Sequence, residues 1–399
     1  MFIVLLLIFD HSTNLYTSLI PNRREKRMNR KPHVGLIVIL MMFPQIIETI
    51  YSPVLPHLAS YFDVSMGTAS QTLSIYFIAF AVGVVVWGRV ADVIGRRKAM
   101  LSGLFIYGIG SALAITANHF DIILIARVLS AFGAAVGSVV TQTMLRDSYD
   151  GKELGKVFSL MGMGISISPV LGLMSGGALS QYAGHFAVFS VLLVLAVVLF
   201  SGSLLTLPET KPEHIQPASF IAVLKTMSKD KAIWKSAILV ACFNIMMFSY
   251  YSLAPFIFDR LGLSSMEFGY SGAVLALASV IGSAMNRHLL SINMKADKLV
   301  IFAVLSSIIG AIGVYLLQGS LWFLIPMMLV VIGFGIAIPN ILSTALVNYK
   351  HQAGTAGAIL GLFYYLMIGT GLGVAAMIGN LGAVLIMTSL LASVMVCRK

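Results

Sequence analysis

The strongest constraint on this chain is a series of long apolar segments separated by short breaks that contain charged residues, glycine, proline or asparagine. Hydrophobic residues make up 58% of the sequence and charged residues 10%, against about 25% charged residues in soluble domains. A bilayer core about 30 Å thick takes about 20 helical residues per crossing. The segments are 34–56, 70–88, 99–117, 121–145, 156–180, 186–207, 233–258, 268–290, 298–317, 320–346, 353–377 and 380–397. The sequence therefore predicts an all-α integral membrane protein with twelve transmembrane helices.

Lysine and arginine occupy alternate connections between these segments. If the N-terminus is cytoplasmic, all but two of the 26 Lys and Arg residues fall at cytoplasmic positions, as the positive-inside rule requires. The exceptions are Arg260, in an outer connection, and Arg127, inside the fourth segment. An odd number of helices would break the alternation. We therefore expect a multi-pass protein with both termini in the cytoplasm.

One long connection divides the chain into two halves. Residues 208–232 contain three prolines followed by apolar residues at helical spacing, which predicts a cytoplasmic linker with an interfacial amphipathic helix. The expected domains are a six-helix bundle over 28–207 and a second over 233–399. We interpret residues 1–27 as an N-terminal extension before a functional start at Met28, because the apolar run within it is too short to span a bilayer.

The sequence contains no pattern typical of catalysis. A hydrolase triad, a phosphate-binding glycine loop and a cofactor fingerprint are all missing from the sequence. The two cysteines, Cys242 and Cys397, offer neither a disulfide framework nor metal-ligand spacing. We therefore expect no enzymatic activity, no cofactor, no metal and no nucleic-acid partner, and any work must draw on gradients or on binding.

A heavily charged turn, G-R-V-A-D-V-I-G-R-R-K over 88–98, joins the second and third segments. Its glycines permit a sharp reversal, and its acid can pair with a neighbouring arginine. From the residues alone, topological anchoring by positive charge is the simpler interpretation. The order of residues in this turn, however, resembles the G-x-L-A-D-x-x-G-R-R-K loop of the major facilitator superfamily. The matching residues are Gly88, Arg89, Asp92, Gly95, Arg96 and Arg97.

Further stretches extend this resemblance. Residues 124–135 resemble the fourth-helix motif of the superfamily, and Gly164, Pro169 and Gly172 match its fifth-helix antiporter motif, although Ser168 and Leu173 replace glycines. The stretches 44–53, 146–149, 207–212 and 353–358 resemble the Bcr/CflA group of drug/proton antiporters, especially its EmrD-like members. The resemblance covers residues 30–397. It implies two pseudo-symmetric six-helix bundles that exchange protons for amphipathic drugs by alternating access.

The resemblance also implies a role for the charged turn. In the family this loop clamps the two bundles together in the outward-facing state. The resemblance therefore implies that Asp92 belongs to a conformational lock. Asp147, which follows the fourth segment, is a candidate partner for Arg89 or Arg96. Charge contacts of this kind are a recognised switching element.

Two ionisable residues lie deep inside predicted spans. Glu48 is the one acid and Arg127 the one base so placed, and such groups are costly unless paired or hydrated. At a rise of about 1.5 Å per residue, both lie about 21 Å from the cytoplasmic face. We hypothesise that they share one polar chamber and couple protons to transport, with Arg127 favouring the ionised form of Glu48 until substrate or a change of state separates them. A permanent structural ion pair is the alternative.

Polar and aromatic residues at helical spacing suggest a substrate pocket. Polar faces in lipid would be costly, so they should point inward. Aromatic rings suit flat, greasy ligands and attract cations. The predicted pocket residues are Gln45, Tyr76, Gln142, Asn244, Phe248, Tyr251 and Tyr365. An aromatic residue at such a position is more often core or lipid-facing, and Tyr251 also fits the outer aromatic belt.

These features together predict a proton-coupled efflux antiporter of the bacterial inner membrane. Its expected partners are hydrophobic or cationic small-molecule drugs, protons and the lipid bilayer, and we expect a monomer that confers antibiotic resistance. A proton-coupled transporter of a single small metabolite would have a more polar pocket. A passive facilitator would not need a membrane-embedded carboxylate, and a membrane sensor would carry a soluble domain.

Overall fold

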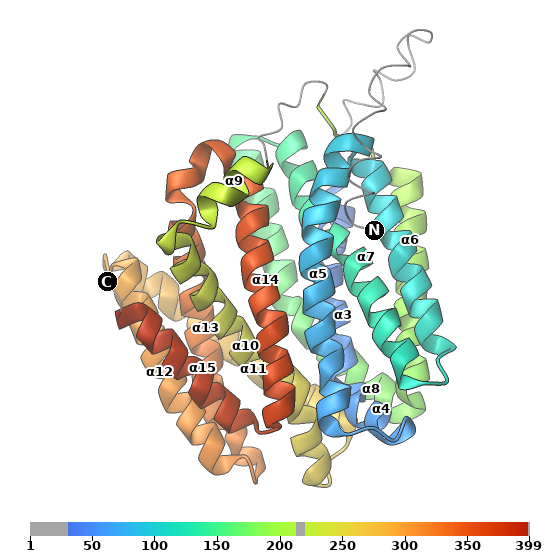
Figure 1. Ribbon diagram of the computed structural model, residues 1–399, viewed down its shortest axis with the longest axis vertical. Coiled ribbons are helices and arrows are strands. Elements are labelled where there is room, and N and C mark those ends of the chain that lie inside the picture. Colours follow the sequence, from blue (N-terminus) through green and yellow to red (C-terminus); the bar gives the residue numbers. More distant parts are fainter. Residues whose placement is uncertain (1–30, 213–219, 398–399) are drawn as a thin grey trace.

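The computed structural model describes residues 31–212 and 220–397 (Figure 1). The expected N-terminal extension, the start at Met28 and residues 213–219 of the expected linker lie outside the described residues. The first half of the chain forms α3 (Val34–Tyr51), η1 (Ser52–Val54), α4 (Leu55–Tyr61), α5 (Met66–Ile94), α6 (Arg96–Ile115), α7 (Phe120–Ser148) and α8 (Gly151–Thr206). The second half forms α9 (Phe220–Met227), α10 (Lys231–Arg260), α11 (Ser265–Ser291), α12 (Ala296–Leu317), η2 (Leu321–Phe323), α13 (Leu324–Ala345), η3 (Val347–Gln352), α14 (Ala353–Ile378) and α15 (Leu381–Cys397).

The described helices provide the twelve crossings that the sequence predicts. Ten helices in the described part of the chain have the length and composition to cross a membrane. One of them, α8, has 56 residues and non-helical backbone at Ala183 and Gly184, so it makes two crossings. Gly184 has a φ of +59°, which glycine adopts without steric cost. The apolar helix α15 has 17 residues and makes the last crossing. The prediction of an all-α membrane protein with twelve spans is confirmed.

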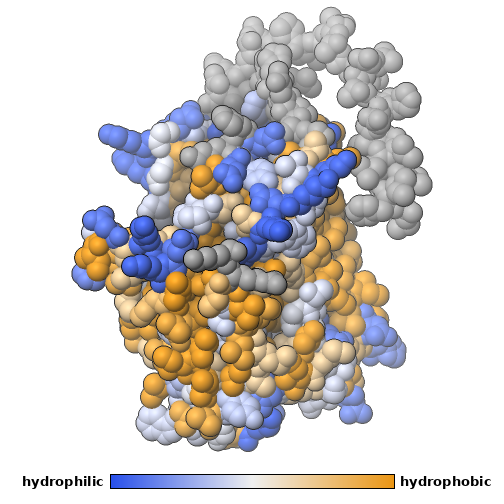
Figure 2. All heavy atoms as spheres, turned by 60° about the vertical axis from the view of Figure 1, so that its left-hand side comes forward, coloured by the Kyte–Doolittle hydropathy of each residue, from blue (hydrophilic) through white to orange (hydrophobic). Residues whose placement is uncertain are grey.

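The helices form two bundles side by side, α3 to α8 in one and α10 to α15 in the other (Figure 1). Figure 2 shows an apolar band across the middle of one face, with hydrophilic residues above and below it. We call the end with the turns at Gly95, Asp150 and Lys295 the basic end, and the end with the turns at Asp63 and Gly379 the opposite end. The short helix α9 lies at the basic end. It buries Val223 and Met227 and leaves Lys225 exposed.

The bundles contact each other mainly through two helix pairs, α5 with α14 and α8 with α11. Glycines bring these helices close together. A Cβ atom at Gly369 of α14 would lie 3.0 Å from the backbone nitrogen of Ile78, and one at Gly177 of α8 would lie 2.6 Å from the carbonyl oxygen of Ser265. Helix α10 also packs against η1 and α4. The described hydrogen bonds that join the bundles all lie in the half of the molecule nearer the opposite end.

Candidate functional site

An acid and a base lie buried in the first bundle. Glu48 on α3 and Arg127 on α7 each expose only 2% of their surface. The guanidinium carbon of Arg127 lies 4.1 Å from the ring centre of Tyr51 and 4.3 Å from that of Tyr76. The two rings therefore hold the cation between their faces, an arrangement worth about 2 kcal/mol or more when water is excluded.

Glu48 and Arg127 interact electrostatically but form no ion pair. Within the described residues, ion pairs join Lys31 to Glu153 and Arg96 to two aspartates. Glu48 Oε2 and Arg127 Nε and Nη2 are buried and have no hydrogen-bond partner among the same residues. This conformation therefore lacks the Glu48–Arg127 ion pair that the alternative hypothesis requires.

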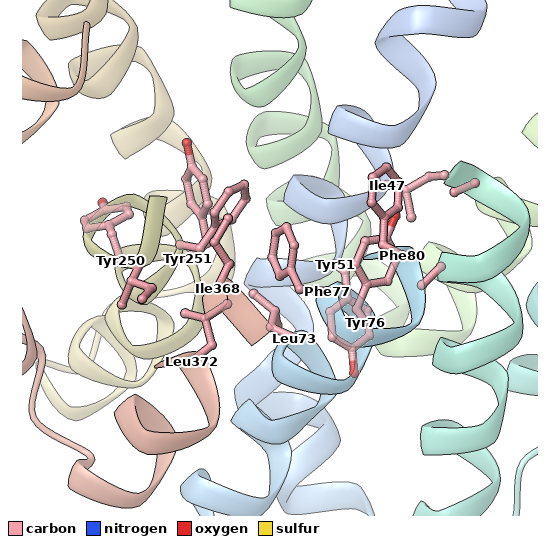
Figure 3. Packing of buried hydrophobic residues seen from close by; sticks show 14 of the residues in the cluster. Ile47, Tyr51, Leu73, Tyr76, Phe77, Phe80, Tyr250, Tyr251, Ile368 and Leu372 are labelled. Carbon is pink, nitrogen blue, oxygen red and sulfur yellow. The ribbon is translucent and has the colours of Figure 1, made fainter. Parts of the chain in front are cut away.

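An aromatic cluster that includes Tyr76 spans both bundles; Figure 3 labels four of its members, Tyr76, Phe77, Phe80 and Tyr251. Its members are Tyr76, Phe77 and Phe80 on α5, Phe248 and Tyr251 on α10, and Tyr365 on α14. The ring centres of Phe77 and Phe248 are 4.5 Å apart, and those of Phe80 and Tyr365 are 5.0 Å apart. Tyr76 contacts both Phe77 and Phe80, so the Arg127 cation and the aromatic cluster share one ring.

The structure brings four of the seven predicted pocket residues into the aromatic cluster: Tyr76, Phe248, Tyr251 and Tyr365. The three polar ones are not joined to it by a described contact. Asn244 donates to the carbonyl of Val240 on its own helix, at 2.8 Å. Gln45 and Gln142 are half-buried, and neither side chain has a hydrogen bond within the described parts of the chain.

A charged cluster at the basic end centres on Arg96. Arg96 Nε donates to Asp147 Oδ2 at 2.9 Å, and Nη1 donates to Asp92 Oδ1 at 2.7 Å. The structure thus pairs Asp147 with Arg96, whereas Arg89 is exposed. All these residues belong to the first bundle.

Glu209, just after α8, holds the start of α6 beside this cluster. Its carboxylate accepts hydrogen bonds from the backbone N–H groups of Arg96, at 2.8 Å, and of Arg97, at 3.3 Å. Gly95 precedes the helix with a φ of +100°, and a Cβ atom there would overlap the Glu209 carboxylate. A negative charge at a helix N-terminus is favourable, because it satisfies free N–H groups and complements the helix dipole.

The glycines of the fifth-helix motif pack against the helix that carries Glu48. A Cβ atom at Gly164 would lie 3.0 Å from the side chain of Met42, and one at Gly172 would lie 3.0 Å from the carbonyl oxygen of Ile46. Pro169 lies between them inside α8. The motif therefore sets the distance between α8 and α3. A movement of α8 would change the packing around Glu48.

Comparison with known proteins assigns the family. The sequence profile of the Major Facilitator Superfamily matches residues 37–387. The chain belongs to the major facilitator superfamily. A solved structure with this fold, that of a D-xylose-proton symporter, superposes with a TM-score of 0.73 at 15% identity, covering 92% of this chain and 96% of the symporter.

Curated relatives from the superfamily match most of the chain. An uncharacterized transporter of Rickettsia felis is 34% identical over 349 residues, which cover 84% of this chain and 86% of the relative. Multidrug resistance protein D of Escherichia coli (strain K12) is 25% identical and covers 91% of this chain and 95% of its own length. Family and fold are thus those of multi-pass membrane transporters.

Two residues of this superfamily member escaped the sequence predictions. Tyr51 forms one side of the cation sandwich, and its signal was its position one turn after Glu48 on the same helix face. Glu209 caps α6 from a distant part of the chain. The available signal was that Glu209 lies in the stretch 207–212, which carries part of the family resemblance. The neighbouring residues did not show which helix it would cap.

Proposed function

We propose that the chain is a proton-coupled antiporter of the bacterial inner membrane that exports hydrophobic or amphipathic drugs by alternating access. The observation that carries the proposal is a buried, unpaired carboxyl group next to an aromatic cluster that both bundles share. Tyr76 contacts both the Arg127 cation and two phenylalanines of the cluster. A ligand that separates these rings would therefore disturb the surroundings of Glu48.

The proton-carrying step is assigned to Glu48, with Arg127 as the charge that responds to it. A carboxyl group in the middle of a bundle can take up a proton when its surroundings open to one side and release it when they open to the other. Substrate binding would then move the Tyr76 ring, and the moved ring would change how readily Glu48 holds a proton. Coupling of this kind requires two conformations that the ligands stabilise differently.

The orientation and the conformational lock follow from charge. The positive-inside rule predicts that the basic end faces the cytoplasm, and with that orientation the hydrogen bonds between the bundles near the opposite end support an inward-facing conformation. The hydrogen bonds and ion pairs of the Arg96 cluster among the described residues all lie within the first bundle, which supports a lock that engages the second bundle in the other state. Asp92→Asn protein should therefore remain folded but transport more slowly, and wild-type rates would count against the lock.

The drug class rests on the aromatic lining and on the relatives. The six residues of the aromatic cluster come from helices of both bundles, and one relative that spans most of the chain is named for multidrug resistance. Aromatic faces bind planar and cationic molecules without directional hydrogen bonds, so a broad set of ligands fits.

Inverted membrane vesicles test this function. Vesicles with the protein should accumulate a fluorescent cationic dye when a pH gradient is imposed and lose it when the gradient is collapsed. Accumulation that is unaffected by the gradient would indicate a facilitator. No accumulation of any dye under a gradient would favour transport of a single metabolite.

The role of Glu48 is tested separately in detergent. Addition of drug to the wild-type protein should release protons into a weakly buffered solution, and Glu48→Gln protein should release none. Asp297→Asn protein is the matched control, because this exposed acid lies at the start of α12, away from the aromatic cluster. Unchanged release from Glu48→Gln protein would refute the assignment.

A further inference from the structure

A proline in α10 leaves a backbone carbonyl without its helical partner. Pro255 lies inside this helix, and proline has no N–H to donate to the carbonyl four residues earlier. That carbonyl belongs to Tyr251, which is 2% exposed. An unpartnered carbonyl in a membrane interior costs free energy, so it needs a donor from elsewhere.

The donor comes from the other bundle. The hydroxyl of Ser52, in η1 of the first bundle, donates a hydrogen bond to the Tyr251 carbonyl oxygen. One residue further along α10, the carbonyl oxygen of Ser252 accepts a hydrogen bond of 3.2 Å from the hydroxyl of Ser70 on α5. Both donor serines are fully buried. Two hydroxyls of the first bundle thus bind two successive carbonyls of the second.

Other polar contacts between the bundles lie in the same half of the molecule. Ser74 on α5 donates to the carbonyl oxygen of Gly369 on α14 at 2.6 Å, and the hydroxyls of Ser180 and Ser265 are 3.3 Å apart. These join backbones that glycines already hold close. The two hydrogen bonds to α10 differ from these, because Pro255 leaves one of the two acceptor carbonyls without its partner within the helix.

We propose that Ser52 and Ser70 are positioning residues of the transport cycle that latch the opposite end closed, by binding the Tyr251 carbonyl that Pro255 leaves without a helical partner and the Ser252 carbonyl next to it. The inference rests on alternating access as proposed above. Opening toward the opposite end separates the bundles, breaks both hydrogen bonds and leaves the Tyr251 carbonyl without a donor until water reaches it. The latch therefore favours the closed arrangement until substrate or proton binding offsets the loss.

Spin-label distance measurements on the full chain test this latch. Asn118→Cys and Gly319→Cys place labels on exposed turns of the two bundles at the opposite end, in a Cys397→Ser background; Cys242 is buried. Removing each hydroxyl with Ser52→Ala or Ser70→Ala should shift the ratio of closed to open protein about fivefold toward open, the factor for one hydrogen bond of typical net strength.

Matched controls separate the latch from general loss of packing. Ser111→Ala and Ser307→Ala remove buried hydroxyls whose hydrogen bonds among the described residues go to carbonyls of their own helices. They should leave the distance distribution unchanged. Distributions for the Ser52 and Ser70 variants that match those of the controls would overturn the proposal.

Pro255→Ala provides a second, independent test. Alanine restores the N–H that can satisfy the Tyr251 carbonyl within the helix, so Ser52→Ala should have much less effect in that background than in the wild type. An equal effect in both backgrounds would refute the link to the proline. These measurements need neither drug nor proton gradient. They can therefore support the latch even if the transport assay finds no drug export, and they can refute the latch even if drug export is found.

Discussion

Replacement of Arg96 by glutamine should destabilise the first bundle more than any other single charge removal at the basic end. The Arg96 side chain is 4% exposed and bonds two carboxylates. Asp147 is 14% exposed, whereas Asp92 is 34% exposed. The two ion pairs therefore lie in different environments, and water screens one much more than the other.

The expected magnitudes follow from this difference. Removing one partner of a buried ion pair costs about 3–5 kcal/mol, because a charge is left uncompensated. A solvent-exposed pair contributes about 0–1 kcal/mol. Arg96→Gln should therefore lower the free energy of unfolding by about 3 kcal/mol, largely through Asp147. Asp92→Asn should lower it by about 1 kcal/mol or less.

Unfolding of the purified protein by titration with SDS provides the measurement. Arg96→Gln/Asp147→Asn protein should be more stable than Arg96→Gln protein, because the second change removes the stranded carboxylate. Arg89→Gln, at an exposed position in the same turn, is the control and should change stability by about 0.5 kcal/mol or less. A double variant whose loss equals the sum of the single losses would contradict the reasoning.

Three further predictions concern other contacts. Glu209→Gln should cost about 1 kcal/mol of stability in the same titration, because the start of α6 loses a charged cap. Gly176→Leu should prevent α8 from packing on α3 and abolish folded protein in size-exclusion chromatography, whereas Gly155→Leu, with open space around it, should not. Arg127→Lys keeps the charge but loses the planar stacking between two tyrosine rings, so dye transport in vesicles should fall at least tenfold; wild-type transport would contradict this.

Most of the fold could be predicted from the sequence because the bilayer leaves few alternatives. Helix length, the alternation of basic connections and the long central connection determine twelve crossings in two halves. The break between the fifth and sixth spans is one example: the predicted segments 156–180 and 186–207 leave residues 181–185 between them, and α8 departs from helical geometry at Ala183 and Gly184.

The site was harder to predict because its geometry depends on contacts between distant helices. Burial of Glu48 and Arg127 could be inferred from the cost of charge in lipid. Their separation could not, since depth along two helices says nothing of the direction in which each side chain points. The position of Tyr51 against Arg127 depends on the packing of α3 against α7.

The cation sandwich explains how an acid can remain available beside a buried base. A direct ion pair would hold the charges of Glu48 and Arg127 together and would have to be broken at each proton transfer. In this structure the rings of Tyr51 and Tyr76 stabilise the guanidinium, so one carboxylate oxygen of Glu48 is left without a partner among the described residues. Tyr76 also packs on the aromatic cluster between the bundles. In the antiporter proposed above, a ligand that displaces this ring would therefore expose the Arg127 charge to Glu48 and couple drug to proton through one tyrosine.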